Sequence, residues 1–165
     1  VKKLKGEVVS EGPDPDIQLR ADAYIPSDYV PDEAERLLEY KELADCRTRE
    51  ELTAALKELA DTFGEPPPEV LRFEQLMEVK VLARELRVER LRTIRGGRLQ
   101  ITFDQTTPVD PLRLMQLVST DANRYTFRPD GVLLIRMTDA DKQDLVRAGV
   151  AILLRLKDCV AQPAG

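Results

Sequence analysis

LRTIRGGRLQITF, residues 91–103, contains the change of periodicity that decides the fold class. Every second residue from Leu99 to Phe103 is apolar, which is the period of a half-buried β-strand. The pair Gly96-Gly97 is typical of a two-residue hairpin turn, so we expect a strand over Leu91–Arg95 to pair with the strand that follows. This hairpin separates a helical first half of the chain from a second half that is rich in strands.

Upstream of the hairpin, three consecutive segments have helical periodicity. The first is expected to begin with Pro31 at its first helical position. Thr48 and Glu51 form a capping box before the second helix, and Gly64 is a good stop for it. The prolines at 66–68 start a third helix of about 18 residues, judged by its apolar spacing. Because the connecting loops are short, we expect the three helices to pack as a cluster.

The flanking segments complete the pattern. Alternating apolar residues over 17–23 predict a strand before the helices. Beyond the first hairpin, Asp110 caps a short helix, a second hairpin turns at 129–131, and Thr138 with Asp141 caps a final helix. The predicted order is β-ααα-ββ-α-ββ-α. It indicates an α+β fold in which a helical cluster packs on a small, mostly antiparallel sheet.

Length and composition restrict the function classes. The 165 residues fit a connector over 1–15 followed by one domain over 16–165, and a chain that starts with Val1 is expected to be a piece of a longer protein. The sequence contains no histidine, no phosphate-binding loop and no dinucleotide-binding glycine motif, so it lacks the catalytic and cofactor-binding groups that most enzyme classes use. Only two cysteines, no export leader and no membrane-length apolar run favour a reducing compartment, the cytoplasm.

Charge is distributed unevenly along the chain. Residues 1–80 carry 20 acidic and 11 basic side chains, a net charge of −9, whereas residues 81–165 carry 10 acidic and 14 basic ones, a net charge of +4. The acidic first half argues against a dedicated nucleic-acid binder, which should be basic overall. It suits a docking surface for a basic partner, because complementary charge steers encounter.

Two groups of charged residues are candidate sites. Glu58 and Asp61 lie three residues apart and off the apolar stripe of the second helix, so they face outward together. Their spacing alone also fits an ordinary solvated helix face. The densest basic stretch predicts either an ion-paired surface or a nucleic-acid contact, and its candidate contact residues are Arg84, Arg87, Arg92, Arg95 and Arg98.

Five segments carry a resemblance to a known family: DIQLRADAYIP (16–26), DYVPD (28–32), TREEL (48–52), ELADTFG (58–64) and PPEV (67–70). Together they resemble the C-terminal domain of bacterial transcription-repair coupling factors (Mfd). The resemblance is dense over residues 16–86 and sparse beyond, and residues 1–7 look like the last turn of the preceding motor domain of that family.

The resemblance implies a function for the chain. Members of the family are ATP-driven DNA translocases that use ATP and Mg²⁺, displace stalled RNA polymerase and recruit the repair protein UvrA. Their C-terminal domain is a non-catalytic clamp that packs on an N-terminal module resembling UvrB, masks UvrA binding and restrains the motor. In this sequence Glu58 and Asp61 correspond to an acidic pair of that interface, and Thr62 stands where the family usually has arginine.

Three functions therefore remain in competition. The first is an autoinhibitory docking domain with no catalytic residue, cofactor or metal of its own and no membrane contact. The second is a nucleic-acid module that uses the Arg84–Arg98 stretch, and it predicts salt-sensitive DNA binding. The third is a small enzyme, for which the sequence supplies no catalytic constellation.

Overall fold

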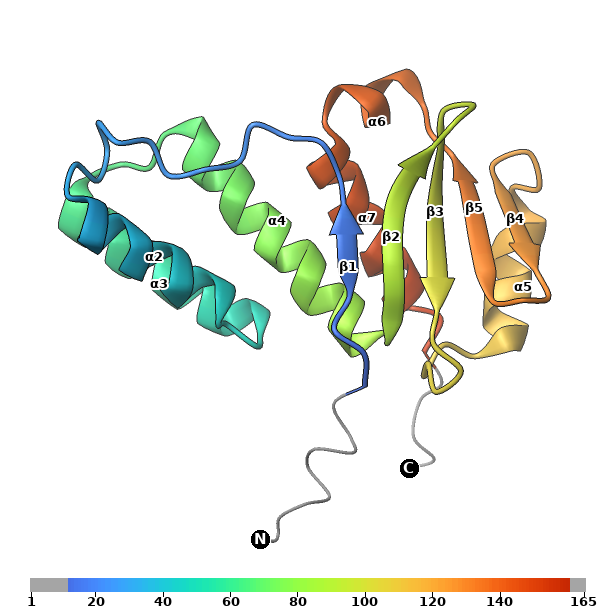
Figure 1. The fold of residues 1–165 in the computed structure, drawn as a ribbon. Coiled ribbons are helices and arrows are strands. Elements are labelled where there is room, and N and C mark those ends of the chain that lie inside the picture. Colours follow the sequence, from blue (N-terminus) through green and yellow to red (C-terminus); the bar gives the residue numbers. More distant parts are fainter. Residues whose placement is uncertain (1–11, 161–165) are drawn as a thin grey trace, which may run out of the picture. The chain divides into compact units, whose positions relative to one another are not determined.

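The computed structural model describes residues 12–160, which form two compact units. Unit 1 joins the described residues up to Leu19 to those from Leu82 onward, and unit 2 is Arg20–Val81. The order of helices and strands confirms the predicted α+β class (Figure 1). Of the connector predicted over 1–15, residues 1–11 lie outside the described residues. No helix within 12–160 is both long and apolar enough to cross a bilayer.

Unit 1 contains a five-stranded mixed sheet in the order β1-β2-β3-β5-β4. Its strands are β1 (Asp16–Gln18), β2 (Val88–Ile94), β3 (Arg98–Phe103), β4 (Tyr125–Arg128) and β5 (Val132–Arg136). β1 pairs with β2 in parallel, and the other three pairings are antiparallel. The sheet is therefore mostly antiparallel, as the sequence predicts.

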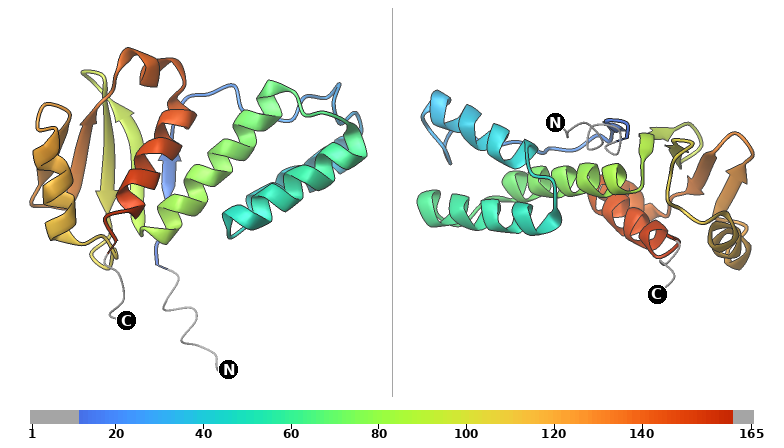
Figure 2. Two further views of the ribbon diagram at one scale, coloured as in Figure 1. Left: turned by 180° about the vertical axis from the view of Figure 1, so that it is seen from behind. Right: turned by 90° about the horizontal axis from the view of Figure 1, so that it is seen from below.

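The helices of the second half cover one face of this sheet. Figure 2 shows α5 (Pro111–Thr120) and α7 (Leu145–Lys157) on the same side of the strands, while the short α6 (Asp139–Gln143) precedes α7. The fully buried side chains of the strands and of α7 form the core here, and they include Leu91, Leu99, Ile101, Leu133, Ile135, Leu153 and Leu156. Burial of this apolar face holds the helices against the sheet.

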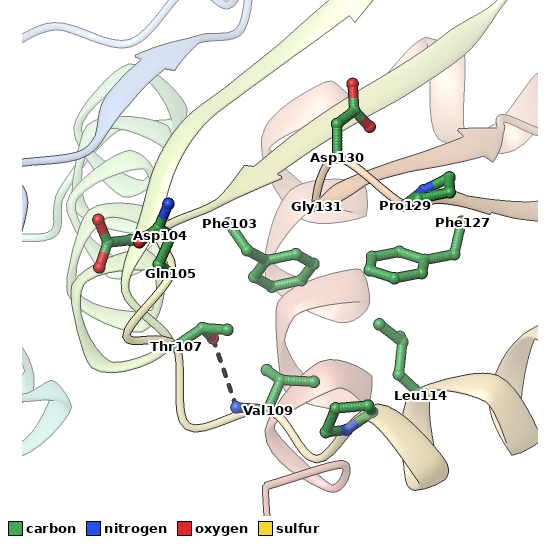
Figure 3. A pocket seen from close by; sticks show the side chains of 11 residues that line it. Phe103, Asp104, Gln105, Thr107, Val109, Leu114, Phe127, Pro129, Asp130 and Gly131 are labelled. Atoms are coloured by element: carbon green, nitrogen blue, oxygen red, sulfur yellow. Dashed lines mark hydrogen bonds between the residues drawn. The ribbon is translucent and has the colours of Figure 1, made fainter.

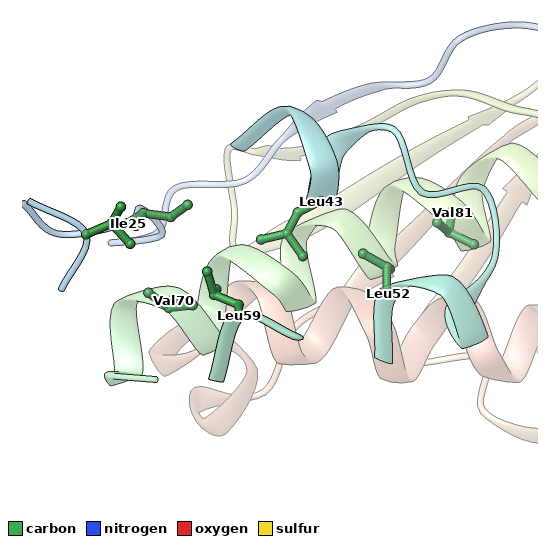
Figure 4. Close-up of a cluster of buried hydrophobic side chains, with 7 residues drawn as sticks. Ile25, Leu43, Leu52, Leu59, Val70 and Val81 are labelled. Carbon is green, nitrogen blue, oxygen red and sulfur yellow. The ribbon is translucent and has the colours of Figure 1, made fainter. Parts of the chain in front are cut away.

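Unit 2 is built from helices. It contains α2 (Glu33–Ala44), α3 (Arg49–Phe63) and most of α4 (Pro68–Glu85), whose last turn is counted with unit 1. All three helices contribute to one apolar core, which confirms the predicted cluster. Figure 4 shows the buried members of this core, which are Ile25, Val30, Leu43, Leu52, Leu59, Val70 and Val81.

Two helix starts differ in detail from the prediction. α2 begins at Glu33 and not at Pro31, because the Asp32 carboxylate accepts a hydrogen bond from the Glu35 backbone N–H at 2.9 Å and thereby caps the helix. At the start of α3 the Thr48 hydroxyl accepts from the Glu51 N–H as predicted, at 3.1 Å. The Glu51 carboxylate, however, accepts from the N–H of Arg47, one residue before the cap.

Three other boundaries also differ. The first strand is limited to residues 16–18, because only these pair with β2 before the chain enters unit 2. The first hairpin turn has three residues, 95–97, since Ile94 pairs directly with Arg98. The final helix is divided at Asp144, which ends α6 and whose side chain caps α7 by accepting from the Arg147 N–H.

Candidate docking groove between α2 and α3

Both acidic residues predicted for an interface lie exposed on α3. Glu58 and Asp61 are one helical turn apart, near the C-terminal end of the helix. The hydroxyl of Thr62, next to Asp61, donates a hydrogen bond to the Glu58 backbone carbonyl at 3.0 Å, so its hydrogen-bond partner lies within the helix. The two carboxylates therefore point away from the core and are available to another surface.

The structure adds residues of α2 to this pair. A groove of about 650 Å³ runs between the two helices, and Glu58 and Asp61 form part of its α3 side. Its lining consists of Leu38, Glu39, Lys41, Glu42, Asp45, Glu58, Asp61 and Thr62. Five carboxylates and one ammonium group give the groove a formal charge of −4.

The lysine of the groove does little to neutralise the carboxylates. Lys41 pairs with Asp45 one turn further along α2, at 2.8 Å, and this hydrogen bond raises the pKa of the lysine. The pair is exposed, so its contribution to stability is small. Within residues 12–160, Glu39, Glu42, Glu58 and Asp61 form no ion pair, and the groove stays strongly negative.

The pKa of Glu39 reflects the crowding of carboxylates in the groove. Partial burial raises the pKa of its carboxyl, and the neighbouring carboxylates of Glu42, Glu58 and Glu35 raise that pKa further. Glu39 in turn adds to the burial effect that raises the pKa of Tyr29. A cation placed in the groove would relieve this repulsion, so the site favours a positively charged partner.

Apolar packing beneath the groove fixes the two helices that form it. Leu43 of α2 and Leu59 of α3 are 1% and 2% exposed and belong to the same core. Tyr40, on α2, accepts a hydrogen bond from the Ile25 N–H at 2.8 Å and packs edge-on against Phe73 of α4. A well-packed core allows few alternative arrangements, so the carboxylates are held in place before any partner binds.

A smaller hollow of about 300 Å³ extends the acidic surface along the same two helices. It shares Glu42, Asp45 and Glu58 with the groove and adds Glu51 and Cys46. Burial raises the pKa of the Cys46 thiol, and the surrounding carboxylates raise it further. Cys46 is therefore held as a thiol, which is the opposite of an activated nucleophile.

The groove also offers an apolar contact. Leu38, which lines it, is 64% exposed, and the adjacent Leu37 is 63% exposed. Transient protein interfaces combine apolar contacts, which add affinity, with charged contacts, which add orientation. The exposed leucines beside the carboxylates supply both kinds of contact. The arrangement suits a protein surface with basic and apolar residues.

Comparison with known proteins decides the family. The family model described as "TRCF domain" matches residues 19–114, more than half of the chain. The chain belongs to the TRCF domain family. This TRCF domain is 31% identical over 165 residues to the transcription-repair-coupling factor of Myxococcus xanthus, and 31% identical over 119 residues to that of Bacillus subtilis.

These relatives are much longer than the chain. The matches cover 99% and 71% of this TRCF domain but only 14% and 10% of the two relatives. A crystal structure described as the C-terminal domain of transcription-repair coupling factor has the same fold, with a TM-score of 0.71 at 19% identity, covering 91% of this chain and 98% of that one. The resemblance seen in the sequence is confirmed.

Sequence reasoning missed the α2 side of the groove. Glu39, Glu42 and Asp45 follow one another at intervals of three residues, a spacing that places them along one side of a helix. This acidic stripe is the signal that could have found them. Which helix it faces depends on tertiary packing, and the sequence gives no direct sign of that.

The first two arginines of the predicted nucleic-acid contact are engaged within unit 1 of the TRCF domain. Arg84, in the last turn of α4, forms an ion pair with Asp14 at 3.3 Å. Arg87 has a left-handed backbone with φ of 53° and donates to the Thr106 hydroxyl at 3.0 Å. Both guanidinium groups have intramolecular partners.

The other three arginines of that prediction lie on and around the first hairpin. Arg92 is on β2 and donates to the Gln100 side chain at 2.8 Å, Arg95 is in the turn, and Arg98 is the first residue of β3. The five arginines therefore do not form one stripe. Contact of this set with nucleic acid stays a prediction.

An apolar pocket of about 430 Å³ lies in unit 1 (Figure 3). Phe103 and Phe127 face each other across it. Hydrogen bonds from Thr106 lower the pKa of Asp104, and a hydrogen bond from Arg128 lowers that of Asp130. Both carboxyls at the rim are thus held ionised, which makes them unsuited to donate a proton at neutral pH.

Proposed function

We propose that this TRCF domain is a non-catalytic docking domain that places its acidic groove on a basic surface of an N-terminal, UvrB-like module of the same protein. In the docked form it masks the UvrA-binding surface of that module and restrains the motor. The observation that carries the proposal is the gathering of five carboxylates, Glu58 and Asp61 among them, in one groove.

Charge and exposure support this proposal. Unit 2, which holds the groove, carries 16 acidic and 8 basic side chains, a net charge of −8. Such a surface attracts a basic partner and repels an acidic one. Thr62 lines the groove where the family usually has arginine, and the absence of that cation makes the groove more negative in this member.

A groove of this kind suits a contact that must be released. Exposed ion pairs contribute up to about 1 kcal/mol each, so a few of them give a weak interface. Within one chain, tethering supplies an effective concentration in the millimolar range, which is enough to keep a weak interface closed. A partner that binds only the open form then shifts the population toward it.

The whole protein is proposed to be a cytoplasmic, ATP-dependent DNA translocase that displaces stalled RNA polymerase and recruits UvrA in DNA repair. ATP and Mg²⁺ would serve its motor. The residues of this chain do not fit a nucleotide, because the sequence has no glycine-rich phosphate loop to hold the phosphates. The role proposed for this chain is therefore regulation by contact.

Reversing the acidic pair in the whole protein tests the proposal. Glu58→Lys with Asp61→Lys should open the protein, because two attractive pairs become repulsive contacts. If each pair contributes about 1 kcal/mol, the apparent affinity for UvrA should rise at least roughly tenfold. The measurement is UvrA binding to wild-type and variant whole protein, with ATP hydrolysis followed in parallel and expected to rise.

The matched control reverses two acids outside the groove. Glu50 at the start of α3 and Glu65 in the following loop are exposed and do not line the groove. Glu50→Lys with Glu65→Lys makes the same change in net charge and should leave UvrA affinity near the wild-type value. Unchanged UvrA affinity in the Glu58/Asp61 variant, with its fold intact, would overturn the proposal.

A further inference from the structure

The face of the sheet opposite α5 and α7 carries a second charged surface, in unit 1. Strand register decides which side chains lie on it, because residues alternate between the two faces. Residues of β2, β3 and β5 that alternate with the buried Leu91, Ile101 and Leu133 belong to this face, and so do the β4 residues that pair with them. We call it the arginine face, and its arginines are Arg90, Arg92, Arg98, Arg128 and Arg136.

Two of these five arginines have acidic neighbours. Arg90 lies 3.8 Å from Asp16 on the neighbouring strand β1, and Arg128 pairs with Asp130 in the following turn. Arg92, Arg98 and Arg136 form no ion pair within residues 12–160, and the hydrogen bond of Arg92 goes to an uncharged amide. The surface therefore keeps three uncompensated cations on the adjacent strands β2, β3 and β5.

The pair Arg98–Arg136 points most directly to an anion. The two residues are register partners across β3 and β5, so their Cα atoms are about 4.5–5.5 Å apart. Like charges directly opposite each other on a sheet are destabilising. A bound oxyanion removes this repulsion, and the planar guanidinium group is suited to bidentate contact with phosphate or carboxylate.

The composition of the arginine face favours phosphates on a chain over an acidic protein. Its aliphatic residues are Val132 and Leu134, which are only 6% and 8% exposed, and the half-buried Ile94, so the apolar surface is small for the centre of a protein interface. The polar residues between the arginines include Gln100 and Thr102, and such side chains are common contacts of the nucleic-acid backbone.

The aromatic residues of the sheet indicate which form of nucleic acid fits. Tyr125 and Phe127 of β4 pair with Ile135 and Leu133 of β5, which places them on the helix-covered face. The arginine face thus has no aromatic platform on which unpaired bases could stack. Backbone contact remains, and double-stranded DNA presents phosphates in a regular, dense array.

We propose that the arginine face binds the phosphate backbone of double-stranded DNA, without reading its sequence, through Arg92, Arg98 and Arg136. This site differs from the arginine stretch singled out in the sequence, because it replaces Arg84, Arg87 and Arg95 with Arg136 from a strand 38 residues after Arg98. It is also independent of the docking groove, which lies in unit 2 and has the opposite charge.

The test is the salt dependence of DNA binding by the 165-residue chain. The probe is a duplex of arbitrary sequence with two helical turns, roughly 20 base pairs. Three phosphate contacts predict that log K falls against log salt with a slope of about −2.7 between roughly 50 and 200 mM. Arg98→Gln with Arg136→Gln should bring the slope to about −0.9 and weaken binding at the lower salt.

Two further variants keep the test decisive. Arg147→Gln with Arg155→Gln removes the same charge from exposed positions on α7 and should leave the slope unchanged. Arg98→Lys with Arg136→Lys keeps the charge and should keep the slope. If the Arg98→Gln/Arg136→Gln variant fails to fold, Arg92→Gln alone should make the slope shallower, from about −2.7 to about −1.8.

Three results would overturn the proposal. One is no duplex binding by the wild-type chain at about 50 mM salt. Another is an equal slope in the wild type and in the Arg98/Arg136 glutamine variant. The third is the absence of duplex binding together with binding of poly-glutamate, which would assign the arginine face to an acidic protein instead.

Discussion

Replacement of Leu59 with alanine is expected to lower the free energy of unfolding of unit 2 by about 2–5 kcal/mol. Leu59 is 2% exposed and lies in the core that α2, α3 and α4 share (Figure 4). Its truncation removes buried apolar contacts and leaves a cavity that a packed core closes only in part. Since a domain of this size has a total stability of about 5–15 kcal/mol, the loss is large.

Amide hydrogen exchange measures this effect in each unit separately. Protection should fall in α2 and α3, while the central strands of unit 1 keep most of theirs. Leu59→Met, which conserves volume, should cost less than about 1.5 kcal/mol. Leu37→Ala, at a position that is 63% exposed, should be close to neutral. Equal loss of protection in both units would contradict an effect confined to unit 2.

The second large effect is expected on docking. When the separately expressed UvrB-like module is titrated into the chain, Glu58→Arg with Asp61→Arg should weaken binding by at least about tenfold, because both attractive pairs become repulsive. The chain has no tryptophan, so calorimetry is the suitable measurement. Wild-type binding should weaken as salt rises, because exposed charges are screened.

Glu50→Arg with Glu65→Arg carries the same charge change outside the groove and should bind like the wild type. Binding of the Glu58/Asp61 variant at wild-type strength would place the interface elsewhere on the domain. Binding that does not respond to salt would contradict an electrostatic groove.

Local signals in the sequence predicted most of the elements correctly. The capping residues Thr48 and Asp110, the stop at Gly64 and the turn at 129–131 all have the predicted roles, because each acts through hydrogen bonds or backbone angles within a few residues. The strand alternation predicted from Leu99 onward is equally local. These features need no knowledge of the rest of the fold.

Predictions failed where distant partners set the outcome. Residues 17–23 alternate like a strand, yet β1 ends at Gln18, because the chain leaves β2 after this residue and enters unit 2 at Arg20. The predicted cap of Thr138 with Asp141 begins only the short α6, because the Asp144 side chain caps a new helix, α7, directly before the apolar residues. Propensity alone does not decide between a helix that continues and one that restarts.

The two charged surfaces show the same contrast. The outward position of Glu58 and Asp61 follows from helical spacing, and the structure confirms their exposure. Their convergence with Glu39 and Glu42 required the packing of α2 on α3. Arg98 and Arg136 are 38 residues apart, and only the pairing of β3 with β5 brings them together. Long-range juxtaposition of this kind is a property of topology and not of local pattern.

The most direct test of the docking groove is a hydrogen-exchange footprint of this chain with and without the UvrB-like module. Docking at the groove predicts slower exchange from Leu38 to Asp45, at the end of α2, and from Glu58 to Thr62 in α3, which together line the groove. Exchange in the sheet of unit 1 should not change. Protection confined to that sheet, with α2 and α3 unaffected, would contradict the proposed docking surface.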